Sequence, residues 1–241
     1  MDCIDYLIKL IDVNRVFDNL SQVKVNSFLK PFNVNHDPEN EDTYLVIGKN
    51  LIGYGLTKLG YKHVKLLQGL PDFDELKFDR YDDDVELSDL IAHEAKFDYV
   101  IAPDEWLTYF KTEKEQLLVI DQISRIASKG FYTTLKDYKN MHIGQRYFQE
   151  PFELKSNNGN AIVIRKRDWN VQDRQCWIDR TYIIHNNNLV VCDPNYRRTM
   201  YFKQLAKFSS NAGATNFQVE KKVMYKPVFS RSFEYVIYIS F

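Results

Sequence analysis

Glycine is concentrated in one short segment of this 241-residue chain. Five of its nine glycines fall between positions 48 and 69, namely Gly48, Gly53, Gly55, Gly60 and Gly69. An average composition would spread about 17 glycines over the whole length. Because glycine is needed where the backbone adopts a positive φ or approaches another group closely, this segment is the first candidate for a ligand site built from backbone atoms.

A second candidate is the segment Ala102-Pro103-Asp104-Glu105-Trp106, which directly follows the apolar run FDYVIA. That run is typical of a buried strand. The segment would then lie at the carboxyl end of the strand, where open α/β sheets bind their ligands. Asp104 could face a ligand there, or it could cap a helix that begins after Pro103.

Several familiar chemistries lack their motifs. The chain contains no GxxxxGK[ST] phosphate loop, no GxGxxG after the first expected strand and no GxSxG nucleophile elbow. The five histidines form neither HExxH nor a cluster, so no metal ligand is predicted. Cys3, Cys176 and Cys192 are odd in number and widely spaced, which favours free thiols in a reducing cytoplasm.

Short apolar runs and helical periodicity alternate in the first half of the chain. Apolar spacing over residues 2–30 predicts one or two amphipathic helices, followed by a polar linker. We therefore expect an N-terminal helical segment over 1–42 and a larger domain over 43–241. The domain begins with expected strands at 44–47, 63–67, 97–102 and 131–135, and expected helices at 51–59, 85–96 and 113–128, with an acidic loop over 72–84.

The second half of the chain has a different pattern. Strand candidates at 152–154, 161–165, 176–184 and 189–192 are joined by polar turns without helical crossovers, which predicts antiparallel pairing within an insertion over 141–198. A helix over 199–211 and strands over 217–224 and 233–241 follow. Together the halves predict an α/β fold: a doubly wound, mostly parallel Rossmann-like sheet with an antiparallel β insertion and a C-terminal antiparallel hairpin.

Bulk composition excludes several classes of protein. Thirty-two basic and 33 acidic residues give a net charge of −1, so no overall field favours nucleic acid or an anionic membrane. The acidic N-terminal segment differs from a signal peptide, and no run of 18 apolar residues predicts a membrane span. We expect a cytoplasmic protein, and the sequence leaves open whether it forms a homo-oligomer.

The order of these elements resembles the core of class I S-adenosylmethionine (SAM)-dependent methyltransferases. The resemblance covers residues 43 to 241 and includes FDYVIAPDEW, EQLLVIDQISRIASKGFYTTLKDY and the C-terminal helix and hairpin. It is a likeness of layout more than of diagnostic motif. It implies SAM as the cofactor and a site at the carboxyl edge of the parallel strands.

The first motif of that family is a strand followed by GxGxG. The three glycine positions correspond to Val46, Gly48 and Asn50, so only the middle one is kept. Asn50 could adopt a left-handed conformation in place of glycine. The resemblance implies that Gly48, Lys49 and Asn50 bind the amino-acid part of the cofactor.

The other implied cofactor residues follow the next strands. The family usually ends its second strand with an acidic residue that binds the ribose hydroxyls, and Gln68 stands at that position. At the end of the central strand, the resemblance implies Ala102 and Asp104 as cofactor-binding residues. An acidic residue commonly contacts the adenine amino group, and the candidates are Asp79, Asp82, Asp83 and Asp84.

The resemblance also bears on the methyl acceptor. DNA-methylating members carry [DN]PP[YFW] where this chain has APDEW, so a DNA base is not expected as the target and a small molecule is. The run Arg165-Lys166-Arg167 with Trp169 could contact phosphates or form a solvated strand end. The pair Arg197-Arg198, with Tyr196 and Tyr201, could line an acceptor pocket or form structural ion pairs.

Three alternatives for the function remain open. The first is methyl transfer from SAM to a small molecule, with Asp104, Glu105 or His142 as general base where the acceptor must lose a proton. The second is a catalytically inactive methyltransferase-like protein that serves in binding or assembly. A third alternative is a different nucleotide in the same crevice.

Overall fold

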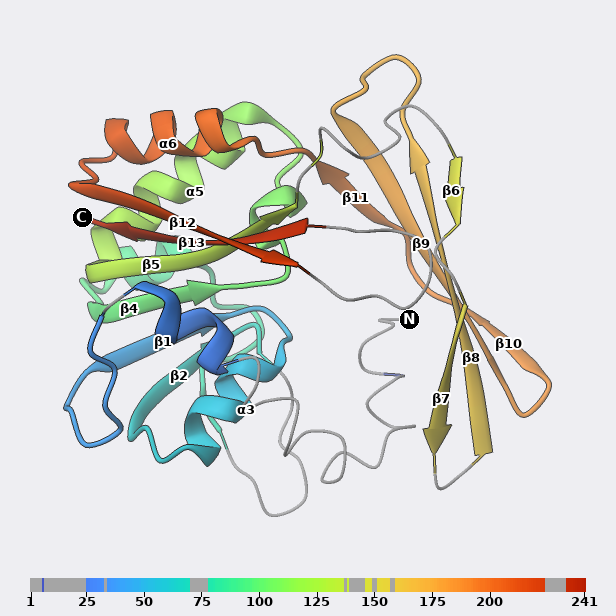
Figure 1. The fold of residues 1–241 in the computed structure, drawn as a ribbon, viewed down its shortest axis with the longest axis horizontal. Coiled ribbons are helices and arrows are strands. Elements are labelled where there is room, and N and C mark those ends of the chain that lie inside the picture. Colours follow the sequence, from blue (N-terminus) through green and yellow to red (C-terminus); the bar gives the residue numbers. More distant parts are fainter. Residues whose placement is uncertain are drawn as a thin grey trace.

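The computed structural model describes residue 6 and residues 25–32, 34–69, 78–136, 138, 146–148, 151–156, 159–223 and 233–241. Its main sheet has seven strands in the order β12-β13-β5-β4-β1-β2-β3. The strands are β1 (Thr43–Ile47), β2 (His63–Leu67), β3 (Asp79–Arg80), β4 (Phe97–Ala102), β5 (Ala127–Lys136), β12 (Asn216–Val223) and β13 (Phe233–Ser240). The first five run parallel, while β13 is antiparallel to both β5 and β12. This confirms the predicted Rossmann-like sheet and C-terminal hairpin (Figure 1).

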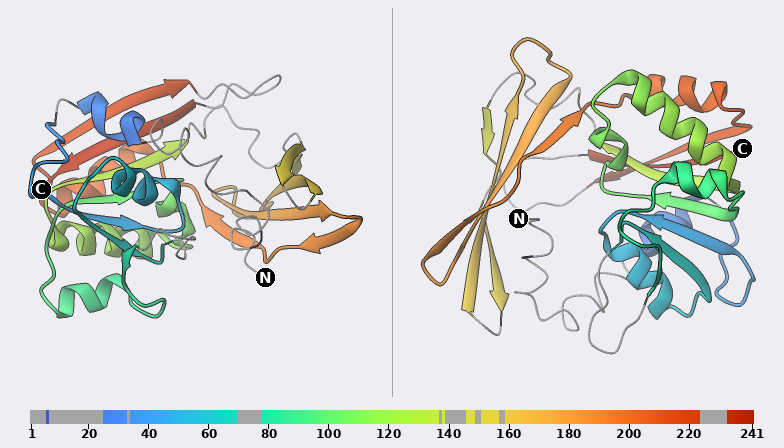
Figure 2. Two further views of the ribbon diagram at one scale, coloured as in Figure 1. Left: turned by 90° about the horizontal axis from the view of Figure 1, so that it is seen from below. Right: turned by 180° about the vertical axis from the view of Figure 1, so that it is seen from behind.

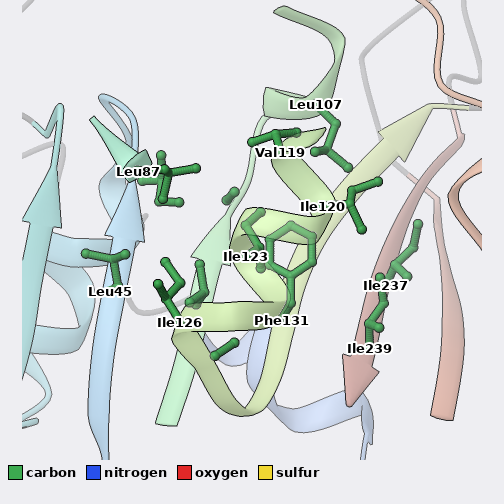
Figure 3. Packing of buried hydrophobic residues seen from close by; sticks show 14 of the residues in the cluster. Leu45, Leu87, Leu107, Val119, Ile120, Ile123, Ile126, Phe131, Ile237 and Ile239 are labelled. Carbon is green, nitrogen blue, oxygen red and sulfur yellow. The ribbon is translucent and has the colours of Figure 1, made fainter. Parts of the chain in front are cut away.

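Helices cover both faces of this sheet. They are α3 (Leu51–Lys58), α4 (Leu87–Ala92), α5 (Glu113–Ile126) and α6 (Phe202–Asn211), with short 3₁₀ helices η1 (Lys30–Phe32) and η2 (Trp106–Tyr109). Alternate residues of β1 point to opposite faces, so Leu45 and Ile47 join the core under α4, α5 and α6, whereas Tyr44 and Val46 join the core under residues 25–32 and α3. Figure 3 shows the first of these cores, with α5 side chains packed over β1, β5 and β13.

A local sequence signal accounts for the start of α5. The Thr112 hydroxyl accepts a hydrogen bond from the backbone N–H of Glu115, and the Glu115 carboxylate accepts one from the N–H of Thr112. This capping box satisfies two backbone donors at the helix start. The helix ends at Ile126, earlier than predicted. Gly130 lies within β5, where a Cβ would meet the Tyr238 ring at 2.3 Å.

Gly53 has a packing role inside α3. A Cβ at this position would lie 2.4 Å from Cδ2 of Leu66 on β2, so glycine lets the helix approach the sheet closely. Glycine in a helix interior costs about 1 kcal/mol relative to alanine, and close packing over Leu66 offsets that cost. Gly60 follows the helix with a φ of +89°, the left-handed conformation that is common just after a helix C-terminus.

The second sheet is antiparallel and lies beyond the carboxyl ends of the parallel strands (Figures 1 and 2). Its central strands are β8 (Gly159–Trp169) and β9 (Cys176–His185). The strands β6 (Arg146–Phe148) and β7 (Phe152–Ser156) pair with β8, and β10 (Asn188–Val191) and β11 (Asn195–Arg198) pair with β9. These strands confirm the predicted antiparallel insertion.

Several local predictions differ from the structure or lie outside its described part. The expected acidic loop contains the short strand β3, and β6 and β11 were not predicted. The expected N-terminal helices lie largely outside the described residues, although residues 25–29 are helical. Cys176 is free, but Cys192 is disulfide-bonded, so the expectation of free thiols is wrong there. The cysteines therefore give no support to a cytoplasmic location.

His36 connects the linker to a cluster of buried tyrosines under the sheet. Its Nδ1 lies 3.0 Å from the Tyr44 hydroxyl, and its Nε2 lies 2.7 Å from the Tyr132 hydroxyl. Burial lowers the pKa of His36 from 6.5 to about 4. Because the unfolded chain takes up this proton more readily, the imidazole contributes stability above pH 6.5 that is lost as the pH falls toward 4.

We predict that His36→Gln flattens the dependence of stability on pH between 6.5 and 4. Glutamine can bond both tyrosines but does not titrate. Urea unfolding at pH 7, 6, 5 and 4 would measure the slope, with the exposed His93→Gln as the matched control. An unchanged slope in His36→Gln would contradict the assignment.

Candidate functional site

A cavity of about 640 Å³ lies at the carboxyl ends of β1, β2 and β4. Three chain segments at the ends of these strands line it, together with the start of α4, part of α5, the first residue of β11 and Asp193 just before that strand. The lining residues are Ile47, Gly48, Lys49, Asn50, Leu67, Gln68, Glu86, Leu87, Ser88, Pro103, Asp104, Trp106, Tyr109, Phe110, Val119, Gln122, Asp193 and Asn195. Both segments singled out in the sequence therefore meet at one cavity.

The loop after β1 forms one wall of this cavity. Gly48 has a φ of +86°, and a Cβ there would lie 3.6 Å from Cδ1 of Trp106. Asn50 is the N-cap of α3, with a φ of −144° and a side-chain oxygen that accepts from the N–H of Ile52. The prediction of a left-handed Asn50 is therefore wrong, because its amide is used to cap the helix and to bond the Ile47 and Gly48 carbonyls.

Val46 and Asn50 occupy the other two glycine positions implied by the resemblance, and they have different structural roles. Val46 is buried inside β1 and pairs with Leu66 and Ile101 on the neighbouring strands. It is a core residue and not part of the loop. Gly48, Lys49 and Asn50 all line the cavity, so the loop is placed where the sequence predicts a ligand, with one glycine in the left-handed region.

The strand ends beside the loop supply the other predicted residues. Gln68 follows β2, is exposed, lines the cavity and has a φ of +53°. Asp104 also lines it, with a φ of +56°. The N-cap of η2 is Glu105, so the alternative of Asp104 as the cap is wrong. Ala102 is fully buried in the core and is not part of the lining; its carbonyl accepts from the Thr133 hydroxyl at 2.8 Å.

The aspartates predicted as candidates for contacting the adenine are not the residues that line the cavity. None of Asp79, Asp82, Asp83 and Asp84 lines it. Instead, Glu86, Leu87 and Ser88 do so, at the start of α4. The sequence signal that could have found them is Asp89, three residues after Glu86, whose carboxylate accepts from the Glu86 N–H at 2.8 Å and marks the helix start.

Aromatic residues of η2 also line the cavity, and the second sheet holds one of them in place. Arg197 on β11 donates from Nη2 to the Tyr109 hydroxyl at 2.5 Å, and its Cζ lies 3.9 Å from the ring centroid. Nη1 of Arg197 also donates to the Thr108 hydroxyl at 3.2 Å. The predicted link between this arginine and a binding pocket is therefore indirect, through Tyr109.

The other residues considered for an acceptor pocket, Arg198, Tyr196 and Tyr201, do not line the cavity. Arg198 bonds Asp173 at 2.9 Å and forms the structural ion pair left open by the sequence. Tyr196 lies beside Lys111, and Tyr201 packs against Tyr138. The second sheet reaches the cavity through Asp193 and Asn195, which the sequence did not single out.

Asp179 organises the face of the second sheet that points toward η2. Its carboxylate accepts two hydrogen bonds from Arg167, at 2.7 and 3.0 Å, and one from the Trp177 indole at 3.0 Å. Nε of Arg197 lies 3.5 Å away. Arg167 is only 3% exposed, so the solvated strand end considered for it is wrong. Trp169 is buried against Trp177.

Glu105 is a buried carboxylate directly behind the cavity wall. It forms an ion pair with Lys136, and the Tyr138 hydroxyl donates to Oε2 at 2.5 Å. Burial raises its pKa, but the charges of Lys136, Arg167 and Arg197 outweigh this effect and lower the pKa to about 2. Glu105 is thus ionised and outside the lining, which makes it unsuitable as a general base.

The same network holds a strained backbone conformation at Asp104 and Glu105. Asp104 and Glu105 both have a positive φ, which costs about 1–3 kcal/mol at each non-glycine residue. The Glu105 N–H donates to the Thr134 hydroxyl at 3.0 Å, and the Thr108 hydroxyl donates to the Glu105 carbonyl at 2.7 Å. These contacts hold the turn that presents Asp104 to the cavity.

Comparison with known proteins identifies the fold. The chain is similar in structure to the CcbJ methyltransferase from Streptomyces caelestis, with 16% identity, coverage of 81% of this chain and 82% of that one, and a TM-score of 0.58. The chain has the class I methyltransferase fold. No family model and no curated protein matches the sequence.

Two further structures support the same fold. One is a SAM-dependent methyltransferase from Clostridium acetobutylicum, with 11% identity, coverage of 89% and 96%, and a TM-score of 0.56. The other is a SAM-bound amino pentose methyltransferase from Micromonospora echinaspora, with 8% identity, coverage of 98% and 94%, and a TM-score of 0.51. At these identities the likeness establishes the fold alone.

No helix in the part of the chain that the structure describes is long and apolar enough to cross a membrane. No group of three or more histidine, cysteine or acidic side chains within the described ranges could hold a metal ion. His142, one of the three general-base candidates, lies outside those ranges.

We predict that Glu105→Gln destabilises the fold by about 3 kcal/mol or more, because Lys136 loses its partner in a buried site. Tyr138→Phe should cost about 1–2 kcal/mol, since Glu105 loses one hydrogen bond. Urea unfolding at pH 7 measures both. The exposed Glu113→Gln is the control and should change stability by less than about 0.5 kcal/mol.

Urea unfolding at acidic pH tests whether Glu105 is ionised in the folded protein. Because its pKa lies below the ordinary value of 4.5, its contribution to stability is present above pH 4.5 and is lost as the pH falls toward 2. Equal stability of Glu105→Gln and wild type at pH 7 would contradict the network.

Proposed function

We propose that this protein transfers a methyl group from SAM to a small-molecule acceptor. The observation that carries the proposal is the cavity at the carboxyl ends of β1, β2 and β4, which lies at the ligand-binding edge of an open α/β sheet. The structural neighbours, which include SAM-dependent and amino pentose methyltransferases, support this reading. A cytoplasmic location and the exclusion of a DNA base stay predictions, and the oligomeric state stays open.

The residues present fit the cofactor in one specific respect. Gly48 leaves open the space that a Cβ would occupy beside Trp106, and its positive φ turns the chain so that the loop lines the cavity. We assign Gly48, Lys49 and Asn50 to the amino-acid part and Gln68 to the ribose. For the adenine we assign Glu86, Leu87 and Ser88, since none of the four candidate aspartates lines the cavity.

SAM supplies an activated methyl group on a sulfonium centre. The protein then has to hold the acceptor atom in line with that group and exclude water, so proximity and orientation provide most of the rate. The aromatic wall of Trp106, Tyr109 and Phe110 suits this task. Of the two general-base candidates within the described residues, Asp104 lines the cavity and Glu105 does not, so we assign Asp104 to the acceptor proton where one must be removed.

The alternative of an inactive binding protein is favoured by a specific observation. Val46 and Asn50 have core and capping roles where the family has glycine, and Gln68 replaces a carboxylate. An inactive protein with an intact cavity would still bind the cofactor but would produce no S-adenosylhomocysteine (SAH). The two functions therefore separate on turnover and not on binding.

We predict that SAM and SAH stabilise the protein in a thermal-shift titration. A ligand at 100 times its Kd adds about 2.7 kcal/mol to the free energy of unfolding. Calorimetric titration gives the affinity directly. No shift at millimolar SAM and SAH would contradict the proposed function, and stabilisation by NAD or ATP instead would indicate a different nucleotide.

Gln68 offers a sharper test of the cofactor's orientation. Gln68→Glu should bind SAH about fivefold more tightly, because a carboxylate forms stronger hydrogen bonds to the ribose hydroxyls than an amide. Gln68→Ala should bind it about fivefold more weakly. All three residues carry a Cβ at the same positive φ, so backbone strain is matched. The exposed Gln172→Glu is the control, and equal affinities throughout would contradict the ribose assignment.

A further inference from the structure

The cavity has two sides when its lining residues are sorted by the elements that carry them. The residues assigned above to the cofactor follow β1 and β2 or lie at the start of α4. The other side includes Asp104, Trp106 and Tyr109, from the end of β4 and from η2, and Asp193 and Asn195, from the second sheet. We call this second group the acceptor side of the cavity.

Strand β11 brings the second sheet to the acceptor side. Arg197 on this strand reaches η2, where it donates to the Tyr109 hydroxyl at 2.5 Å. Side chains two residues apart on a strand point to the same face, so Asn195 shares the face of Arg197, and it lines the cavity. Asp193 lines the cavity just before the strand begins. The second sheet therefore contributes a carboxylate to the acceptor side.

The lining of the cavity is acidic. Within the described part of the chain it contains the three carboxylates of Glu86, Asp104 and Asp193 and the single ammonium group of Lys49. SAM carries one more positive than negative charge at neutral pH, so bound SAM balances only part of this negative charge. Because a charge removed from water is costly unless it is paired, an acceptor with one positive charge suits the remainder.

The arginine nearest to the acceptor side lies behind the wall. Arg197 is not a lining residue. Its Cζ lies 3.9 Å from the centroid of the Tyr109 ring, and its Nε lies 3.5 Å from the Asp179 carboxylate. The carboxylate that accompanies this arginine is thus Asp179, inside the second sheet, whereas Asp104 and Asp193 lie on the cavity side of the wall.

An aromatic ring beside the carboxylates also suits a cation. Trp106 is half-buried and packs against Phe110, with ring centroids 4.9 Å apart and an angle of 81° between the rings. It borders the cofactor loop as well, since a Cβ at Gly48 would lie 3.6 Å from its Cδ1. The face of an indole attracts a cation within about 6 Å of the ring centroid. The acceptor side therefore offers both carboxylates and an aromatic ring.

We propose that the methyl acceptor is an amine that enters the cavity as an ammonium ion, and that Asp104 of the main domain and Asp193 of the second sheet bind it. The inference rests on the proposed function, because it names the acceptor class of that reaction. It adds Asp193 as a specificity-determining residue. The two carboxylates attract an ammonium group and repel an anionic acceptor of the same size.

The two carboxylates have different tasks in the reaction. An ammonium nitrogen has no lone pair, so it must first lose one proton, which Asp104 accepts and passes to solvent. The nitrogen lone pair then forms the bond to the methyl carbon while the carbon–sulfur bond breaks, and the electron pair of that bond stays on sulfur to give SAH. Positive charge passes from sulfur to nitrogen, where Asp193 stabilises it.

The test uses three probes of one size that differ in charge, namely benzylammonium, benzyl alcohol and benzoate. Calorimetric titration of the 241-residue protein saturated with SAH, at pH 7 and constant ionic strength, measures their affinities. Benzylammonium should bind about tenfold more tightly than benzyl alcohol, and benzoate should bind most weakly. Asp193→Asn and Asp104→Asn should each weaken benzylammonium about tenfold and leave benzyl alcohol unchanged.

The variants are matched to the wild type in shape. Asparagine has the size of aspartate and tolerates the positive φ of Asp104. The exposed Glu220→Gln, on β12, removes a carboxylate outside the cavity lining and should bind all three probes as the wild type does.

Each negative outcome points to one of the two proposals. If SAH binds but benzylammonium binds no more tightly than benzyl alcohol, the ammonium site is overturned and methyl transfer to another acceptor stands. The same holds if Asp193→Asn and Glu220→Gln bind benzylammonium equally well. If SAH fails to bind, the methyl-transfer proposal is overturned, and the same titrations of the SAH-free protein still decide whether the ammonium site exists.

Discussion

The carboxylate of Asp179 is the contact on which the arrangement of the two sheets depends. It bonds Arg167 and Trp177 within the second sheet and lies beside Arg197, which in turn contacts Thr108 and Tyr109 of the main domain. An arginine buried without a carboxylate would be costly. The position of Tyr109 on the cavity wall therefore depends on an acidic residue in another sheet.

A second buried acid supports the main-domain side of the same wall. Glu105 is surrounded by Lys136, Tyr138 and two threonine hydroxyls, and this network offsets the strain of two consecutive left-handed residues. The two neighbouring acidic residues therefore have different roles. Glu105 is structural, and its neighbour Asp104 is left facing the cavity.

The sequence predicted the layers and most strands because apolar periodicity is a local property, as the runs at 44–47 and 97–102 show. It also located the loop at Gly48 and the residues Gln68 and Asp104. It could not show that Glu105 is buried, because Lys136 and Tyr138 lie about thirty residues further along the chain. Nor could it show the role of Gly53, which depends on Leu66 across a helix–sheet contact, or the cavity residues at the start of α4.

The strand order has a consequence for how the chain folds. β13 lies between β5 and β12, and its partners on β5 include Leu135, which pairs with Tyr235 about one hundred residues later. Contacts of such separation carry a high loop-closure entropy and slow folding. The intervening sheet has local hairpins of its own, such as β8 with β9. Early formation of that sheet would shorten the effective loop between β5 and β13, which lowers the entropic cost of completing the main sheet.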